Sequence, residues 1–301
     1  MKHRIEYIFL RALAAFIQSL SLEAARKIAK FLAAFFYYCI PLRRAITLQQ
    51  LRFAFPERPE KQIRSICFES YRNLFYMLVE MLWIPNYTDD ILRRSIRFEN
   101  PELITKALKK GRGLIFLSGH LGNWELLAYG CSHLLGVPFT IIIHPQQNKA
   151  VADMINELRC MRGNRVVDMR MGVREIIHTL RNRGVVAMLS DQSGPSNSLF
   201  VDFFGRPAAT YEGPATIALK TNAPMLFATG VRQEDGSYSI FLQDMKVEEF
   251  TGGSTKENIE SLTTRHVQAL EEVIRSYPGQ WLWQHRRWKH KPPQQSESPS
   301  T

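Results

Sequence analysis

One short stretch of the chain combines residue types that can catalyse a group transfer. His120 and Glu125 lie five residues apart, after a glycine and around the start of a helix-forming run. A carboxylate that accepts the proton of one imidazole nitrogen leaves the other nitrogen free to act as a general base. Such a pair can deprotonate a hydroxyl so that it attacks an acyl carbonyl. The alternative is a turn histidine beside an acid that the positive end of a helix favours.

The secondary structure around this pair decides whether its side chains can meet. Inside one continuous helix, residues five apart point about 140° away from each other. The apolar run 114–118 predicts a strand, the run 124–135 predicts a helix, and Asn123 is a favourable residue to begin that helix. His120 then lies in the loop that enters the helix, and Glu125 lies in its first turn. We therefore predict that the two side chains converge.

The string G-H-L-G-N-W-E at 119–125 resembles a known family. His120 and Glu125 match the H-x-x-x-x-E form of the signature of membrane glycerolipid acyltransferases, and the full string is similar to the late lipid A acyltransferases of Gram-negative bacteria, the lauroyl and myristoyl transferases. Further similar segments follow in order: A-F-P-E at 54–57, R-G-N-R at 162–165, D-Q at 191–192, F-F-G at 203–205 with Pro207, and W-Q-H-R-R-W-K at 283–289. One departure is Gln49-Gln50-Leu51, where the family often has Asn-Leu.

This resemblance implies an acyltransferase of lipid A (lipopolysaccharide) biosynthesis. The enzyme would move a fatty acyl chain from acyl carrier protein to a hydroxyl of a lipid A precursor. His120 would be the general base, Glu125 would orient it, and the chemistry would need neither a metal nor another cofactor. The alternatives are the same chemistry on another membrane lipid or glycolipid, and an inactive homologue that only binds lipid. The intact His120 and Glu125 argue against the inactive homologue.

Four further residues are predicted to support the reaction. Arg165 begins a predicted strand, and we expect it either to stabilise the oxyanion or to bind a phosphate of the acceptor. Asp191 and Gln192 follow the apolar run 185–190, at a strand end where open α/β sheets bind their ligands. With Asn123, they are predicted to bind substrate. The alternatives are a solvated arginine and an aspartate that only forms a turn.

The charge of the chain predicts an anionic partner. The 301 residues include 39 Lys and Arg against 28 Asp and Glu, a formal charge of +11. Phospholipid headgroups, the phosphates of a lipid A precursor and an acidic acyl carrier protein all fit this charge. Nucleic acid is disfavoured, because the chain has no recognition-module signature and its basic residues are spread along it. The four cysteines show no paired metal spacing and do not require an oxidising compartment.

The N-terminal region predicts attachment to a membrane. Residues 5–20 and 31–42 are apolar and rich in aromatics, but each run is shorter than the roughly 20 residues of a spanning helix. Basic residues beside aromatics are typical of an interface, and the resemblance implies the inner membrane, with the catalytic part facing the cytoplasm. We predict membrane-associated helices over 1–42, an acyltransferase domain over 43–290 and a disordered tail over 291–301. The alternative is that both runs are core helices.

After about residue 110, strand-like and helical runs alternate. Strands are predicted at 114–118, 139–143, 165–168, 185–190, 225–232 and 238–244, and helices at 124–135, 149–161, 173–183, 211–221 and 255–277. This alternation predicts an α/β fold with a mixed sheet flanked by helices and a site at the strand ends.

Overall fold

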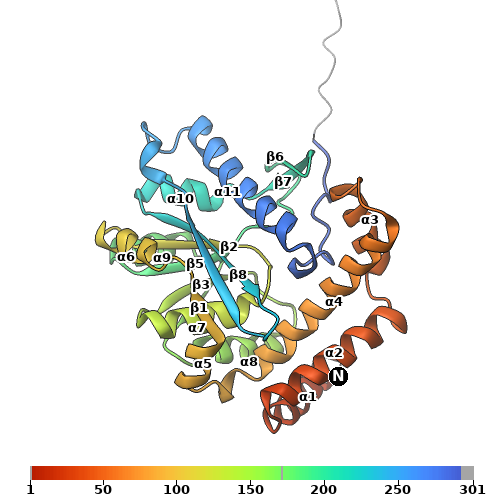
Figure 1. Ribbon diagram of the computed structural model, residues 1–301. Coiled ribbons are helices and arrows are strands. Elements are labelled where there is room, and N and C mark those ends of the chain that lie inside the picture. The colour runs from red at the N-terminus through yellow and green to blue at the C-terminus, as the bar shows by residue number, and fades with distance from the viewer. Residues whose placement is uncertain (1, 171, 293–301) are drawn as a thin grey trace, which may run out of the picture.

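A seven-stranded mixed sheet lies at the centre of the protein (Figure 1). The computed structural model describes residues 2–170 and 172–292. The order of the strands across the sheet is β1-β9-β8-β2-β5-β3-β4. Their bounds are β1 Ile96–Phe98, β2 Leu114–Ser118, β3 Phe139–Ile143, β4 Arg165–Asp168, β5 Val185–Leu189, β8 Met225–Arg232 and β9 Tyr238–Asp244. The predicted α/β fold with a mixed sheet is therefore confirmed.

Strand direction brings two loops of the sequence to the same edge of the sheet. Within the seven-stranded sheet, β2, β3, β4 and β5 run parallel, β8 runs parallel to β2, β1 runs parallel to β9, and the β8–β9 pair is antiparallel. The first four residues of β2 are all buried, which is typical of a parallel strand covered on both faces. Ser118 at the end of β2 pairs with Leu189 at the end of β5. The loops that follow β2 and β5 therefore begin side by side.

Helices cover both faces of the sheet. The helices of the chain are α1 Lys2–Gln18, α2 Leu22–Tyr38, α3 Arg44–Ala54, α4 Glu60–Leu82, α5 Asp89–Ser95, α6 Glu102–Lys109, α7 Trp124–Leu135, α8 Lys149–Cys160, α9 Val173–Arg181, α10 Gly213–Thr221 and α11 Lys256–Ser276, with short 3-10 turns at Ile84–Asn86, Val247–Glu249 and Pro278–Gln280 (η3). Because side chains alternate along a strand, Ile115 and Leu117 pack in one core cluster with α9, α10 and α11, whereas Leu114 and Phe116 pack in the other with α7 and α8.

The helix after the histidine loop begins and ends where the sequence predicts. The side chain of Asn123 accepts a hydrogen bond from the backbone N–H of Leu126 at 3.0 Å and so caps the first turn of α7. Gly136 follows the last residue with a φ of 65°, a left-handed conformation that glycine adopts without a steric cost. These two local signals leave His120 in the entering loop, as predicted.

One small antiparallel pair of strands was not predicted from the sequence. Strand β6 (Leu199–Phe203) pairs with β7 (Arg206–Thr210) outside the main sheet. Its two-residue turn contains Phe204 and Gly205, both with positive φ, as in the turns that best fit the twist of a hairpin. A bulky phenylalanine at such a position is uncommon. This explains why the residues were not interpreted as a hairpin turn.

The N-terminal helices pack against the rest of the protein along one face each. Helix α2 lies beside α4 (Figure 1), and its fully buried Ala25, Ala29 and Ala33 recur every four residues, as contact with a neighbouring helix requires. The opposite faces of α1 and α2 expose large apolar side chains, among them Phe9, Phe16, Phe31 and Phe35. Among residues 2–170 and 172–292, no helix is both long enough and apolar enough to cross a membrane. Association of α1 and α2 with a membrane stays a prediction.

The predicted boundary at residue 42 falls between α2 and α3, although the inner face of α2 belongs to the same cores as the body. The predicted disordered tail lies outside the described residues except for positions 291 and 292.

A fully buried carboxylate connects α2 to the loop that carries His120. Glu80 on α4 accepts hydrogen bonds from Arg26 Nε at 2.7 Å, Tyr238 Oη at 2.7 Å and Asn123 Nδ2 at 2.8 Å. A second guanidinium, that of Arg232, lies 3.5 Å from the same carboxylate. Burial of a carboxylate is costly unless it is paired and hydrogen-bonded. The ion pair with Arg26 therefore offsets much of the free-energy cost of burying the Glu80 carboxylate.

Replacing Arg26 by Ala should lower the free energy of unfolding by roughly 3 kcal/mol, the size usual for removing one partner of a buried ion pair. Urea denaturation followed by circular dichroism measures this difference. The matched control is Lys27→Ala, whose cation pairs with Glu23 on the exposed surface of the same helix and which should leave stability nearly unchanged. Equal unfolding curves for the two variants would show that Arg26 contributes no more than a surface charge.

Candidate active site

The loops after β2 and β5 bring His120 and Asp191 into direct contact. His120 lies two residues beyond the end of β2, and Asp191 lies two residues beyond the end of β5. The distance from His120 Nδ1 to Asp191 Oδ1 is 2.6 Å, and the backbone N–H of His120 donates to Asp191 Oδ2 at 2.7 Å. One carboxylate therefore fixes both the ring and the backbone of the histidine. With Nδ1 engaged, Nε2 is the ring atom that remains for a proton transfer.

Asp191 is buried and receives a third hydrogen bond. The indole N–H of Trp281 donates to Asp191 Oδ2 at 2.7 Å. Burial alone would raise the pKa of Asp191, but the attraction to the His120 ring and the three hydrogen bonds outweigh it and lower the pKa to about 2. Asp191 is therefore a carboxylate at neutral pH.

The contact that lowers the pKa of Asp191 raises the pKa of His120. Burial favours neutral His120, but the charge of Asp191 and its hydrogen bond outweigh burial and raise the pKa of His120 above its ordinary value of 6.5. A raised pKa makes the neutral imidazole a stronger proton acceptor, which is what a general base requires. Gln192 Nε2 lies 3.4 Å from His120 Nε2, and the ring of Trp124 packs edge-on against the imidazole at 4.8 Å between centroids.

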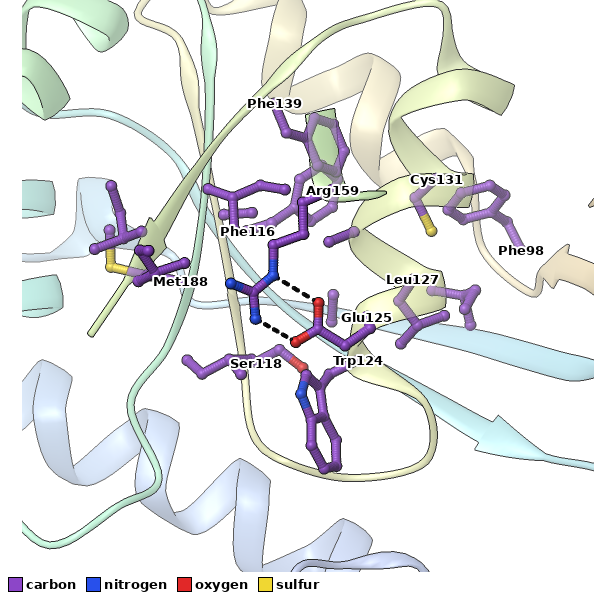
Figure 2. A pocket seen from close by; sticks show the side chains of 18 residues that line it. Phe98, Phe116, Ser118, Trp124, Glu125, Leu127, Cys131, Phe139, Arg159 and Met188 are labelled. Atoms are coloured by element: carbon purple, nitrogen blue, oxygen red, sulfur yellow. Dashed lines mark hydrogen bonds and ion pairs between the residues drawn. The ribbon is translucent and has the colours of Figure 1, made fainter. Parts of the chain in front are cut away.

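Glu125 does not make the contact with His120 that the sequence predicted. Its two carboxylate oxygens accept hydrogen bonds from Arg159 on α8, at 2.6 Å from Nη2 and at 2.8 Å from Nε (Figure 2). The first turn of α7 directs this side chain toward α8, and the position beside the imidazole belongs to Asp191. Glu125 still acts on His120 through space, because its negative charge raises the pKa of the histidine while the charge of Arg159 lowers it.

Arg165 lies at the opposite edge of the sheet from His120. It is the first residue of β4 and pairs with Thr140 at the beginning of β3, in line with Val186 and Ile115. Ile115 precedes His120 by five residues, which corresponds to roughly 15 Å along a strand. The side chain of Arg165 is 61% exposed and its Nη1 lies 3.3 Å from Glu175 Oε1. This placement does not support the predicted role of Arg165 at the oxyanion or at an acceptor phosphate.

The remaining predicted site residues, Asn123, Gln192 and Asp191, have different surroundings in the structure. Asn123 is fully buried, and both ends of its amide are occupied, by Leu126 N–H and by Glu80. It therefore shapes the loop, and because it is fully buried and lines neither cavity described below, its position does not support the predicted contact with substrate. Gln192 lies on the wall of the cavity that contains His120. Asp191, predicted to bind substrate, is instead in contact with the imidazole.

Two cavities meet at the ion pair between Glu125 and Arg159. The first is apolar, has a volume of about 100 Å³ and lies between α7 and the sheet, where Figure 2 shows Glu125 and Arg159 among apolar side chains such as Phe116 and Phe139. The second has a volume of about 530 Å³ and contains His120 and Gln192 in its wall. The two cavities share Trp124, Glu125, Arg159, Ile142, Ile143, Met188 and Leu189. An apolar cavity therefore adjoins the cavity that contains His120.

A family model described as "Bacterial lipid A biosynthesis acyltransferase" matches residues 2–290. The chain belongs to this family. It is 27% identical to the lipid A biosynthesis palmitoleoyltransferase of Escherichia coli (strain K12) over 257 residues, which cover 83% of this chain and 80% of the relative. It is 24% identical to the lauroyltransferase of the same strain over 257 residues, with the same coverage of 83% and 80%.

A more limited similarity extends to an enzyme with another acceptor. The chain is 27% identical to the phosphatidylinositol mannoside acyltransferase of Mycobacterium tuberculosis (strain CDC 1551 / Oshkosh) over 124 residues, 40% of this chain and 39% of the relative. The protein is an acyltransferase of lipid A biosynthesis by family, which confirms the resemblance drawn from its sequence.

Sequence reasoning did not identify Arg159 or Trp281 as members of the acyltransferase site. Arg159 lies on a helix that the sequence predicted, but it was treated as one of many arginines. Trp281 lies two residues before the segment 283–289, which resembles the family but gives no role to Trp281. Neither residue has a local spacing to His120 that would reveal the contact, because each is brought to the site by the order of the strands and by the path of the C-terminal segment.

Proposed function

We propose that this acyltransferase moves a fatty acyl chain from the thioester of an acyl carrier protein to a hydroxyl of a lipid A precursor. The observation that carries the proposal is the His120–Asp191 pair, which lies beside an apolar cavity. A charged Asp191 holds Nδ1, and Nε2 is the free base. The family assignment supports a lipid A acceptor, and the net charge of +11 is complementary to an acidic carrier protein and to acceptor phosphates.

In the proposed reaction, His120 Nε2 takes the proton of the acceptor hydroxyl as its oxygen attacks the thioester carbonyl carbon. The resulting tetrahedral intermediate carries a negative oxygen. It collapses by breaking the carbon–sulfur bond, and the imidazolium returns its proton to the leaving sulfur. Asp191 stabilises the transient imidazolium and keeps the ring in the reactive tautomer, as the aspartate of a serine protease triad does.

The oxyanion of this intermediate needs hydrogen-bond donors directed at it. We propose that the side-chain amide of Gln192 is one, because its nitrogen lies 3.4 Å from His120 Nε2. The first N–H groups of α7 are further donors, because the initial turn of a helix has no acceptors within the helix for them. Arg159 replaces Arg165 as the arginine of the site, since it lines both cavities.

We further propose that the acyl chain of the donor occupies the apolar cavity between α7 and the sheet. Burial of each methylene contributes about 0.8 kcal/mol, so an apolar cavity selects a chain by the length it can bury. Cys131 is buried on the wall of this cavity, six residues beyond Glu125 in the sequence, or roughly 9 Å further along α7. Its position is therefore suited to limit the length of the chain.

Cys131→Phe is expected to shift the enzyme toward shorter donors. The larger ring fills the distal part of the cavity, so kcat/KM for a sixteen-carbon donor should fall at least roughly tenfold relative to a twelve-carbon donor. Competition between the two acyl donors, read by mass spectrometry of the product, measures this ratio. Cys131→Ala is the matched control and should not favour the shorter donor. An unchanged ratio in a folded Cys131→Phe protein would place the acyl chain elsewhere.

The same proposal locates the enzyme on the cytoplasmic face of the inner membrane. The outer faces of α1 and α2 expose aromatic and aliphatic side chains, which are typical of helices that lie in the plane of an interface. Basic residues accompany them, including Lys2, Arg4 and Arg11. An acceptor that is itself a membrane lipid would be reached from such a surface.

The experiment that tests the proposed function compares acceptors directly. Purified enzyme receives an acyl carrier protein thioester together with a lipid A precursor, a lysophospholipid or a mannosylated phosphatidylinositol, and products are identified by mass. One acyl chain added to the lipid A precursor alone is the expected result. Transfer confined to the mannoside would favour the glycolipid acceptor indicated by the similarity to the mycobacterial relative. No transfer to any of them would contradict the proposal.

A further inference from the structure

A segment near the C-terminus crosses both loops of the active site. Residues 280–287, here called the C-terminal strap, begin at the last residue of η3. The strap bonds the histidine loop through Leu282 N–H to His120 O at 3.0 Å and through Gly122 N–H to Gln280 O at 2.9 Å. It bonds the aspartate loop through Ser193 N–H to His285 Nε2 at 2.9 Å. The strap therefore holds together two loops that the sheet only brings near each other.

Trp281 is the residue of the strap whose side chain donates to Asp191. Its indole N–H donates to Asp191 Oδ2 at 2.7 Å, while Asp191 Oδ1 faces His120 Nδ1 at 2.6 Å. The indole is 1% exposed and is enclosed by the rings of Phe203 and Trp283, at 5.7 and 4.6 Å between centroids. A ring enclosed in this way has little freedom to turn, so its N–H points in a fixed direction.

We propose that Trp281 is a positioning residue for the acyl transfer, because its N–H fixes Asp191 Oδ2 and thereby keeps Oδ1 directed at His120 Nδ1. This inference rests on the proposed function of the His120–Asp191 pair. Without the indole donor, the only hydrogen bond to Oδ2 from residues 2–170 and 172–292 would be the one from the backbone N–H of His120. The carboxylate could then rotate, and the imidazole would lose the orientation that a general base needs.

The charged groups around the pair determine the direction of the pH effect. Glu125 and Arg159 face His120 from α7 and α8, and His285 and Arg287 face Asp191 from the strap. Burial lowers the pKa of His285 to about 4, so His285 is neutral and accepts the Ser193 hydrogen bond. Loss of the Trp281 donor leaves the charge of the Asp191 carboxylate less neutralised, and this charge raises the pKa of His120 more than the hydrogen bond from one oxygen does. The pKa of His120 should therefore rise, and the acid limb of kcat/KM should move to higher pH.

The test uses two tryptophans of the same strap. Trp281→Phe keeps an aromatic ring and removes the donor. It should lower kcat roughly tenfold or more, as expected when a hydrogen bond to a charged group is lost, with KM nearly unchanged and the acid limb shifted upward. Trp283→Phe is the matched control, because Trp283 is equally buried but donates to Pro278 O at 2.7 Å. It should preserve kcat and the pH profile even where its melting temperature falls.

Two results would overturn the positioning role. One is a Trp281→Phe enzyme with the kcat and pH profile of Trp283→Phe, which would make Trp281 a core residue only. The other is a raised KM at unchanged kcat, which would indicate a substrate contact. If Trp281→Phe does not fold, replacement of Trp281 by benzothienylalanine keeps the shape of the side chain without its N–H and should give the same loss.

A double variant separates this inference from the proposed function. In Asp191→Asn, the further change Trp281→Phe should have no additional effect on the acid limb, because the two residues act through one contact. An additional shift would show that Trp281 acts by another route. A fully active Asp191→Asn enzyme would instead contradict the proposed His120–Asp191 base itself, whatever the result at Trp281.

Discussion

His120→Ala should lower kcat by roughly a hundredfold to ten-thousandfold, the range usual for the loss of a general base. The substitution removes the imidazole that Asp191 orients, and Nε2 of that ring is the atom proposed to take the proton of the acceptor hydroxyl. The KM for the acyl donor should change little, because the apolar cavity proposed to hold the chain lies beyond Glu125 and Arg159 and is not lined by His120. Steady-state kinetics with the lipid A precursor measures both values.

The matched control for this experiment is His144→Ala. His144 also lines the larger cavity, but it is exposed and lies outside the contact with Asp191. Its removal should leave kcat within a few-fold of the wild-type value, as is usual for surface positions. A folded His120→Ala enzyme with wild-type kcat would contradict the mechanism, and an equal loss in both variants would point to the shape of the cavity as the cause.

Asp191→Asn should cost roughly a thousandfold to ten-thousandfold in kcat, the scale found when the aspartate of a catalytic triad is replaced by its amide. An amide that turns its nitrogen toward Nδ1 stabilises the wrong tautomer, and it cannot stabilise an imidazolium. Glu125→Gln should cost less, since Glu125 bonds Arg159 and reaches His120 only through space. A larger loss in Glu125→Gln than in Asp191→Asn would restore Glu125 as the partner of the histidine.

The pH profile of Asp191→Asn tests independently whether Asp191 raises the pKa of His120. In the wild type the pKa of His120 is raised above 6.5, and activity requires the neutral ring, so kcat/KM should rise with pH through a value above 6.5. Without the charge of Asp191, burial dominates and lowers the pKa of His120. The residual activity of the variant should therefore extend to lower pH, even though its maximum is far smaller. If the pH dependence of kcat/KM in Asp191→Asn were the same as in the wild type, Asp191 would not set the pKa of His120.

The parts of the fold that follow from neighbouring residues were predictable. The alternating strands and helices after residue 110 agree with the structure to within a few residues, because apolar periodicity and end signals such as Asn123 and Gly136 are local. The residue types around His120, together with the family resemblance, predicted His120 as the general base. The partner of His120 was not predictable in the same way, since Asp191 is 71 residues away and reaches the imidazole only because β5 lies next to β2.

The other differences between the predicted and the observed site also arise from contacts between segments that are distant in the sequence. Because Glu125 is only five residues from His120 in the sequence, it was predicted to contact the imidazole. In the structure α8 lies beside Glu125, and its Arg159 binds the carboxylate instead. Arg165 looks suitable because it begins a strand, whereas the site lies where the parallel strands end. Asn123 was expected to face substrate, yet Glu80, from a helix 43 residues earlier, occupies its amide nitrogen. Each of these contacts depends on packing between distant segments, which a local pattern does not record.

The C-terminal strap also has a consequence for the order in which the enzyme becomes competent during synthesis. All seven strands of the main sheet have left the ribosome's catalytic centre once Asp244 is added, so the nascent chain already contains both His120 and Asp191. The strap that bonds their loops begins at Gln280, which is added 36 residues after Asp244. Domains tend to form from the N-terminal side as the chain emerges, so the strap cannot bond the two loops until residues 280–287 have emerged as well. A polypeptide that terminates before Gln280 would carry His120 and Asp191 without the hydrogen bonds that join the strap to their loops.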